Sequence, residues 1–301
     1  MKHLIISGIL GLALTAPTSA GETITRKLDV GANPEVHVIN ARGDIEVKGD
    51  GLGEVKVKAK LVDSVERLDV QERDGRVTIE VVYKKKSRGE KGWSWNSGGT
   101  TLYVAVPTDT TLHAEGVSSD VEVGNVQGKL YLNTVSGDID AESFGGKLKV
   151  VTTSGDIDVR GHNISAWNGL ETVSGDIQMT GLSGELRATT VSGSIDAEDC
   201  MFDRVTAGVT SGDIDLTKSL SASADVDAEA VSGDVMLTMQ RGWGGRVDIS
   251  TLNGSIDNCF GPKPKRVSRY GPGRVLNFDH GDGNGRIEVE TVNGDIDLCT
   301  E

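Results

Sequence analysis

Ser136-Gly137-Asp138-Ile139 is one of a series of similar tetrapeptides that runs through most of the chain. The other copies are Ser154-Gly155-Asp156-Ile157, Ser174-Gly175-Asp176-Ile177, Ser192-Gly193-Ser194-Ile195, Ser211-Gly212-Asp213-Ile214, Ser232-Gly233-Asp234-Val235, Asn253-Gly254-Ser255-Ile256 and Asn293-Gly294-Asp295-Ile296. From Gly137 to Gly254, the glycines are 18 to 21 residues apart. A period of about 20 residues predicts structural units that stack on one another, rather than a globular domain around one central pocket.

Apolar and polar residues alternate on both sides of each glycine. Leu130, Leu132 and Thr134 precede Gly137, and Ile139 and Ala141 follow it, with mostly polar residues between them. Alternation with a period of two is typical of strands that have one buried face. Each unit is therefore predicted to be a strand, a glycine turn, a second strand and a variable turn.

Two short strands in about 20 residues cannot bury a core of their own, so we expect the units to stack in register. The predicted fold class is all-β, a parallel β-helix or β-solenoid of ~20-residue coils. An antiparallel meander or a propeller is the competing architecture, but a propeller blade needs about 40 residues and four strands.

The chain divides into three regions. Residues 1–20 combine Lys2, a short apolar run and Thr18-Ser19-Ala20, which is the pattern of a secretion signal peptide. Weaker repeats and longer alternating strands indicate that residues 21–110 form an N-terminal β region, which caps the solenoid because an open end is an unpaired sheet edge. Residues 111–301 are predicted to form the repeat solenoid, with a long excursion at 260–285 that interrupts the period.

The composition limits location and partners. No segment after the signal is apolar over the length needed to cross a bilayer, so we expect no transmembrane segment and an exported protein that is periplasmic, on the cell surface or secreted. A net charge of −14 disfavours nucleic acid as a partner, and is compatible with divalent cations, basic partners or neutral glycans.

Two of the three cysteines share a repeat position. Cys259 and Cys299 lie five residues after Gly254 and Gly294. If their units stack as neighbours, their backbones are ~4.8 Å apart, which is within the range of a disulfide. We therefore predict a Cys259–Cys299 disulfide, and expect Cys200 to be a free, partly buried thiol.

Aspartates recur directly after most of the glycines. Stacked carboxylates offer the oxygen ligands that calcium prefers, which makes Asp138, Asp156, Asp213 and Asp295 candidate metal ligands. The alternative is structural: an aspartate after glycine commonly stabilises a turn, and an acidic face keeps a solenoid unpaired. We expect no other cofactor.

Two basic loops interrupt the acidic surface. Their candidate interaction residues are Lys84, Lys85, Lys86, Trp93, Trp95, Lys265, Arg266, Arg269 and Tyr270. Exposed tryptophan beside cations suits stacking on a glycan or binding to an acidic protein. The alternative is a solvated hairpin tip whose tryptophans pack back on the cap.

Catalytic and metal-binding patterns are weak. The Ser/Asn column before glycine has no repeating histidine or lysine beside it, so we interpret it as a hydroxyl ladder in a turn. The histidines after the signal, which are His37, His113, His162 and His280, are far apart in the sequence and show no recognisable metal-ligand spacing.

Three stretches carry a resemblance to a known family. They are Asn40-Ala41-Arg42-Gly43-Asp44-Ile45, Val104-Ala105-Val106-Pro107 and the ending from Ile287 to Ile296, together with the serial Val-Ser-Gly-Asp-Ile units. With them, nearly the whole mature chain resembles a family of exported bacterial proteins described as adhesins, a domain of unknown function. The resemblance implies a β-solenoid-like fold and brings no catalytic residues.

The leading hypothesis is therefore a non-enzymatic exported β-solenoid that acts as an adhesin-like scaffold at the cell surface or envelope, with an envelope protein or a glycan as its partner. One alternative is a carbohydrate-active β-helix enzyme that acts on an acidic polysaccharide, since such enzymes use paired acids or clustered charges in a cleft. The other alternative is a calcium-binding solenoid.

Overall fold

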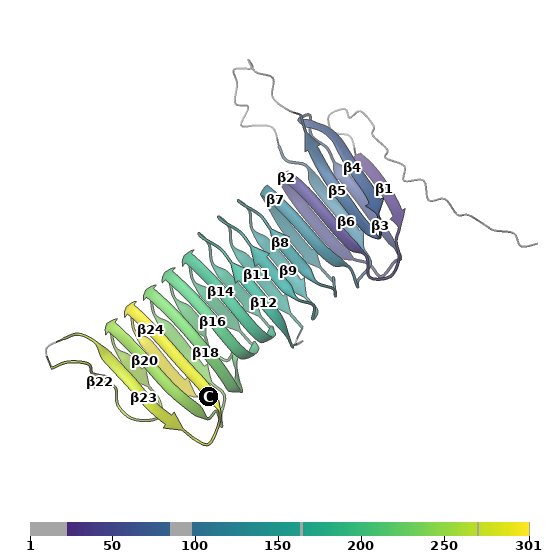
Figure 1. The fold of residues 1–301 in the computed structure, drawn as a ribbon. Coiled ribbons are helices and arrows are strands. Elements are labelled where there is room, and N and C mark those ends of the chain that lie inside the picture. Colours follow the sequence, from purple (N-terminus) through teal and green to yellow (C-terminus); the bar gives the residue numbers. More distant parts are fainter. Residues whose placement is uncertain (1–22, 85–97, 163–164, 270, 301) are drawn as a thin grey trace, which may run out of the picture.

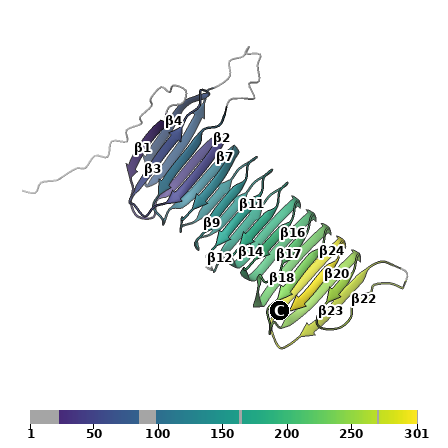
Figure 2. The same cartoon turned by 180° about the vertical axis from the view of Figure 1, so that it is seen from behind.

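The computed structural model describes residues 23–84, 98–162, 165–269 and 271–300. Within these residues the protein is all-β, and its strands stack into one elongated rod with the chain's first strands at one end and its last strands at the other (Figures 1 and 2). The predicted fold class is confirmed. The described residues contain no helix long and apolar enough to cross a membrane. The predicted signal peptide lies outside the described residues.

Each repeat contributes one strand to each of two parallel sheets. The first sheet contains, in spatial order, β8 (Leu130–Asn133), β10 (Leu148–Val151), β12 (Ser165–Glu171), β14 (Ser183–Ser192), β16 (Met201–Ser211), β18 (Leu220–Ser232), β24 (Gly285–Asn293) and β20 (Gly245–Asn253). The second sheet contains β9 (Ile139–Ser143), β11 (Ile157–Gly161), β13 (Ile177–Thr180), β15 (Ile195–Glu198), β17 (Ile214–Leu216), β19 (Val235–Met239), β25 (Ile296–Thr300) and β21 (Ile256–Asn258).

The core lies between the two sheets and is built from like residues in register. Ile157, for example, pairs with Ile139 on one side and Ile177 on the other, and all three are at most 1% exposed. Inward-facing threonines are also satisfied, since the Oγ1 of Thr152 donates to the backbone carbonyl of Gly137 in the preceding coil at 3.3 Å. These inward-facing threonines are thus buried together with a hydrogen-bond partner in the neighbouring coil.

The glycine of each repeat lies where the backbones of neighbouring coils approach most closely. Gly212 has a φ of +139°, and a Cβ built on it would lie 2.1 Å from the carbonyl oxygen of Gly193. A conformation with positive φ and no room for a side chain admits glycine alone. This close approach explains why glycine recurs at this position.

The N-terminal end is not stacked in sequence order. β2 (Glu35–Gly49) and β7 (Thr111–Gly124) are long strands that run through both sheets and pair with each other. On its other side, β2 pairs with β5 (Arg76–Tyr83) and β6 (Thr101–Val106). Three antiparallel strands then cover this end: β4 (Val65–Arg73) on β5, β3 (Glu54–Lys60) on β6, and β1 (Thr23–Asp29) on β3. β2 is thus a coil inserted between two later segments of the chain.

The C-terminal end repeats this arrangement. The last segment, β24 and β25, lies between the coil of β18 and β19 and the coil of β20 and β21. The excursion at 260–285 contains β22 (Lys265–Arg266) and β23 (Arg274–His280), and β23 runs antiparallel to β20 at the outer end (Figure 1). The chain therefore forms its outermost coil first and then returns to fill the position inside it.

The cysteines follow from this topology. Cys259 and Cys299 form the predicted disulfide, with their Cα atoms 4.8 Å apart, and it joins the outermost coil to the inserted one. Cys200 is a free, buried cysteine whose thiol donates to the carbonyl of Glu198 at 3.3 Å. Burial raises the pKa of this thiol to about 11, so it stays protonated and unreactive at neutral pH.

Candidate functional site

The aspartates after the glycines form a hydrogen-bond ladder between coils. The backbone N–H of Asp156 donates to Oδ1 of Asp138 at 2.9 Å, and the N–H of Asp176 donates to Oδ1 of Asp156 at the same distance. The ladder continues through Asp213, Asp234 and Asp295 to the last coil. Ser194 substitutes for aspartate in one coil, and its Oγ accepts the N–H of Asp213 at 3.2 Å.

This ladder gives the candidate calcium ligands a structural role. One oxygen of each carboxylate accepts a hydrogen bond from the next coil, rather than from the residue's own turn as the sequence suggested. The column is thus accounted for by coil-to-coil bonding, because a carboxylate that accepts a backbone N–H makes a strong hydrogen bond. The serine in one coil shows that the role needs an acceptor oxygen and not a charge.

A second carboxylate row lies on the outer face of the second sheet. Asp196 pairs in register with Asp215, and Asp297 with Asp257. Burial, followed by neighbouring carboxylates, raises the pKa of Asp196 and the pKa of Asp297. Like charges opposite each other destabilise a sheet, so this face carries an electrostatic cost that a cationic partner would relieve.

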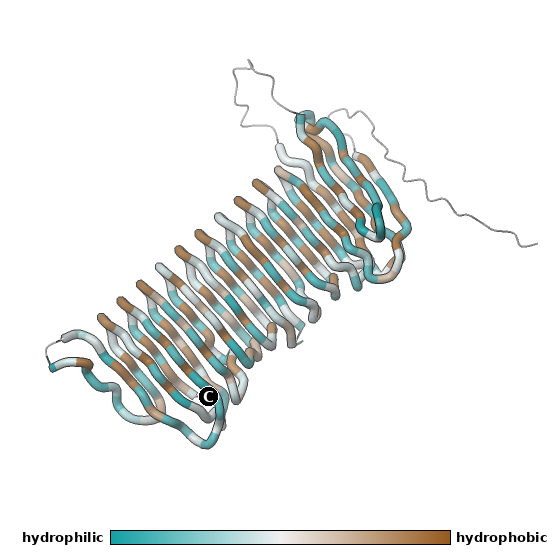
Figure 3. The backbone as a smooth tube through the Cα atoms, in the orientation of Figure 1, coloured by the Kyte–Doolittle hydropathy of each residue, from teal (hydrophilic) through white to brown (hydrophobic). Residues whose placement is uncertain are grey.

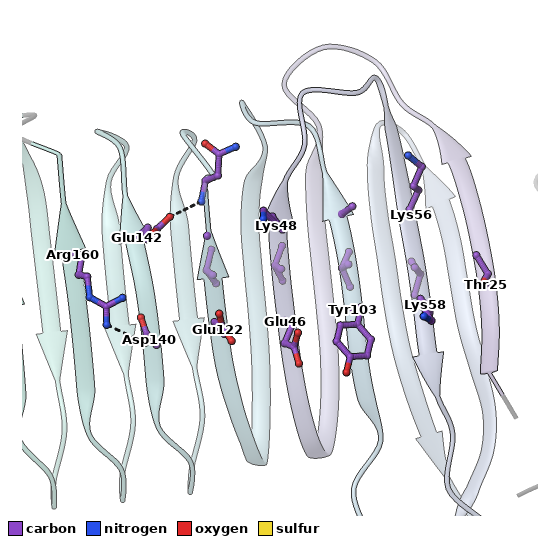
Figure 4. Close-up of a pocket in the computed structure, with 17 residues that line it drawn as sticks. Thr25, Glu46, Lys48, Lys56, Lys58, Tyr103, Glu122, Asp140, Glu142 and Arg160 are labelled. Atoms are coloured by element: carbon purple, nitrogen blue, oxygen red, sulfur yellow. Dashed lines mark hydrogen bonds and ion pairs between the residues drawn. The ribbon is translucent and has the colours of Figure 1, made fainter. Parts of the chain in front are cut away.

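The same face forms a shallow groove of about 570 Å³ near the N-terminal cap. Figure 4 shows Glu46, Glu122 and Asp140 in a row across neighbouring strands, with Lys58 and Tyr103 on the strands beyond. Burial, with the nearby charge of Glu122, raises the pKa of Glu46. The groove therefore combines acids with lysines rather than presenting a single sign of charge.

The predicted interaction loops are described in part. Lys84 lies at the start of the first loop, where its Nζ donates to the carbonyl of Asp63 at 2.6 Å. Lys265, Arg266 and Arg269 are exposed on the C-terminal excursion. Lys85, Lys86, Trp93, Trp95 and Tyr270 fall outside the described residues, so the prediction for them stands untested.

An exposed apolar column, absent from the sequence-based site, runs along the glycine-turn edge. It consists of the residue two positions before each glycine or its equivalent. In spatial order these residues are Val117, Val135, Thr153, Val173, Val191, Thr210, Val231, Val292 and Leu252, which we call the valine edge. The valines and the leucine are 40–52% exposed, and Figure 3 shows hydrophobic colour recurring at the chain reversals along one edge.

Acidic residues flank the valine edge on both sides. On one side lies the exposed aspartate column that contains Asp138 and Asp234. On the other side, the first-sheet position two residues before the edge is glutamate in four of the nine coils, namely Glu115, Glu171, Glu229 and Glu290. Coils spaced at ~4.8 Å make the edge a straight apolar line of about 40 Å between carboxylates. Ordered apolar ladders of this extent differ from the scattered apolar residues of an ordinary surface and mark interaction sites.

At its C-terminal end, the valine edge becomes one wall of a groove. The excursion folds over the edge and places Val267, which is 66% exposed, opposite Val231, Leu252 and Val292. The groove has a volume of about 780 Å³. Arg274 anchors the excursion, since its Nε donates to the carbonyl of Gly254 at 3.1 Å. The edge thus ends in a concave apolar site large enough for several side chains.

The repeat signature itself contains the signal for this edge. Valine stands before serine in most Val-Ser-Gly-Asp units, and comparison of that position between coils would have revealed a column of apolar residues that alternation predicts to be outside the core. Within a single repeat, by contrast, this position belongs to neither the core, the turn nor the acidic positions.

Stacked parallel coils, repeated outer faces and two covered ends define a capped β-solenoid. The chain belongs to the Toastrack DUF4097 family, whose model matches residues 35–255. The family resemblance predicted from the sequence is therefore confirmed for the family as a whole. A comparison with curated proteins finds no match.

The chain is similar to solved structures of bacterial proteins. A "putative lipid binding protein" from Parabacteroides distasonis ATCC 8503 is 15% identical with a TM-score of 0.50, covering 92% of this chain and 97% of that one. A "putative adhesin" from the same organism is 13% identical, with a TM-score of 0.44 and coverage of 92% and 97%. At this identity the first supports similarity of fold, and no functional argument rests on either.

Proposed function

We propose that this protein is a non-enzymatic, exported interaction scaffold whose valine edge binds an extended, basic and amphipathic polypeptide segment. The observation that carries the proposal is the apolar ladder, interrupted by Thr153 and Thr210, with the aspartate column on one side and four glutamates on the other. Such a surface offers burial to apolar side chains and charge complementarity to lysine or arginine at alternate positions. An extended segment suits the edge because the edge is straight, and about 12 extended residues span its length of about 40 Å.

Charge argues against other occupants of the edge. A second copy of this chain would bring its own carboxylate rows against these, and an anionic membrane surface would be repelled in the same way. A basic segment instead neutralises the rows, in keeping with the net charge of −14. The groove under Val267 supplies the point at which one larger apolar side chain of the partner is enclosed.

Matched peptides test the proposal on the tag-free mature chain. A 12-residue peptide of alternating valine and lysine spans about 40 Å when extended and should bind at low salt. A valine–glutamate peptide tests the charge, and a serine–lysine peptide tests the apolar contact. Equal binding of all three would refute the proposal, and edge-to-edge dimerisation in solution would favour a second copy as the occupant.

Two natural threonines supply matched variants. Thr153 and Thr210 stand in the valine edge without disturbing it, so Val173→Thr, Val191→Thr and Val231→Thr should combine in a folded protein. Loss of about one buried methyl group at each position costs about 2–3 kcal/mol in total, which is on the order of 50-fold in affinity. The reverse variant, Thr153→Val with Thr210→Val, should bind more tightly.

A second candidate is cleavage of an acidic polysaccharide in the groove of Figure 4. It is favoured by the raised pKa of Glu46, which is the property of a general acid, and by the lysines that line the same groove. Loss of polysaccharide viscosity on addition of the protein, abolished by Glu46→Gln, would support this function over the scaffold. Unchanged viscosity would remove it.

A further inference from the structure

Two histidines that are 76 residues apart in the sequence meet on the outer face of the first sheet. His37 lies on β2 and His113 on β7, and the parallel pairing of these strands places them directly opposite each other. Glu35, two residues before His37 on the same strand face, completes a cluster. One ligand atom from each of the three residues lies within 4.8 Å of the other two.

The two imidazoles converge on one carboxylate. Nε2 of His37 lies 2.7 Å from Oε1 of Glu35, and Nε2 of His113 lies 3.6 Å from the same oxygen. The rings stack at 4.2 Å with an interplanar angle of 11°, and Tyr131 of the next coil stacks on His113 at 4.6 Å. Strand register therefore holds both imidazoles beside the same carboxylate.

We propose that Glu35, His37 and His113 form a binding site for a divalent transition-metal ion, with Zn²⁺ or Cu²⁺ as the ion. Two imidazole nitrogens and one carboxylate oxygen are a donor set that these ions prefer, whereas calcium and magnesium take oxygen ligands. With three protein ligands, the remaining positions are open to water.

The surroundings define what binding requires. Nη2 of Arg76 lies 3.0 Å from Oε1 and 3.2 Å from Oε2 of Glu35, and an ion would share the carboxylate with this guanidinium. Because an ion lies in the plane of each imidazole it binds, the rings must rotate out of their parallel stack. The side chains of Glu35, His37 and His113 are 22–36% exposed, which leaves room for that rotation and for entry of the ion.

Such an ion would join the inserted coil to its neighbour. His37 belongs to β2, the coil that lies between the outer coil of β5 and β6 and the coil of β7. At the opposite end, the disulfide joins an inserted coil to its neighbour in the same manner. We therefore expect the ion to stabilise the N-terminal end of the rod, since a ligand that binds the folded state raises its stability.

Calorimetric titration of the tag-free mature chain at neutral pH tests the site. Zn²⁺ and Cu²⁺ should each bind with a stoichiometry of one per chain and raise the melting temperature, while Mg²⁺ and Ca²⁺ should do neither. His113→Asn should weaken binding about tenfold or more, because even loss of a group that only orients a metal ligand costs about 10–100-fold in affinity. His162→Asn is the control, because His162 stacks on Phe144 away from this cluster and its loss should leave binding unchanged.

A second measurement needs no variant. Electron paramagnetic resonance of the wild-type protein with one equivalent of Cu²⁺ should show coupling to two imidazole nitrogens. Absence of binding at millimolar Zn²⁺, binding that survives His113→Asn, or a copper spectrum without two nitrogen ligands would each overturn the proposal. A melting temperature measured in chelator separates loss of the ligand from loss of the fold.

Discussion

Replacement of Gly212 by alanine tests the close approach of backbones on which the rod depends. The added Cβ would lie 2.1 Å from the carbonyl oxygen and 2.6 Å from the carbonyl carbon of Gly193, which are both backbone atoms that cannot rotate away. The φ of +139° adds strain for any residue with a side chain. The two coils must therefore separate locally, by about 1 Å if the contact is to reach an ordinary van der Waals distance.

The expected cost follows from what that separation breaks. The N–H of Gly193 donates to the carbonyl of Ser211 at 3.0 Å, and the N–H of Asp213 donates to Oγ of Ser194 at 3.2 Å, so both bonds join the two coils that must separate. Each such bond contributes about 0.5–1.5 kcal/mol, and backbone strain at an alanine here costs about 1–3 kcal/mol. We expect a total loss of about 3–5 kcal/mol, which is at the upper end for a single substitution.

Chemical unfolding followed by circular dichroism measures this loss. Gly31→Ala is the matched control, since its Cβ would meet no atom within 4 Å and its stability should change by less than about 0.5 kcal/mol. A loss below about 1 kcal/mol for Gly212→Ala would refute the close-approach explanation, because a clash of this depth cannot be relieved without breaking coil-to-coil bonds.

Three further predictions concern the ladder, the acidic face and the disulfide. Asp156→Asn should retain the acceptor for the next coil and leave the unfolding midpoint unchanged or higher, whereas Asp156→Ala should cost about 0.5–1.5 kcal/mol, and added calcium should shift neither midpoint. Asp196 and Asp297 have raised pKa values, so their contribution to stability is fully present below the ordinary aspartate pKa and is lost as the pH rises through the raised values. The double variant Asp196→Asn with Asp297→Asn should therefore show a smaller fall in melting temperature between about pH 4 and about pH 7 than the wild-type protein. An unchanged fall would contradict this account of the two aspartates. Cys299→Ser removes a disulfide that joins residues 40 apart and should lower the free energy of unfolding by about 4 kcal/mol, mainly through the entropy of the unfolded chain. The loss should appear first as faster proteolysis of the excursion at 260–285. Equal protease resistance would show that the coils hold this end without the disulfide.

Much of the fold could be predicted because the residue pattern within each repeat indicates its strands, its turn and its buried face. Alternation around Gly137 separates buried from exposed positions with a period of two, and the shared repeat position of Cys259 and Cys299 predicts their contact. The order of the coils could not be predicted. Like residues occupy like positions in every coil, so the step of 40 residues from Gly254 to Gly294 is compatible with a last coil inside or outside the excursion.

The candidate sites were missed for a related reason. The valine edge and the His37–His113 pair both arise from one repeat position compared between coils, and neither is visible within a single unit. His37 and His113 each lie six residues before the turn position that is occupied by Gly43 in one coil and Ser119 in the other, so alignment of the weaker N-terminal repeats would have placed them side by side. Spacing along the chain, by contrast, showed them as unrelated residues.

The inserted C-terminal coil has a consequence for synthesis and truncation. β24 and β25 follow β20 and β21 in the chain and leave the ribosome after them, yet they fill an interior position between coils made earlier. A chain that stops before Gly285 would thus lack a middle coil and leave two unpaired sheet edges on either side of the gap, which is a worse loss than a shorter stack. Any change in the number of repeats must therefore preserve the inserted coil of β24 and β25.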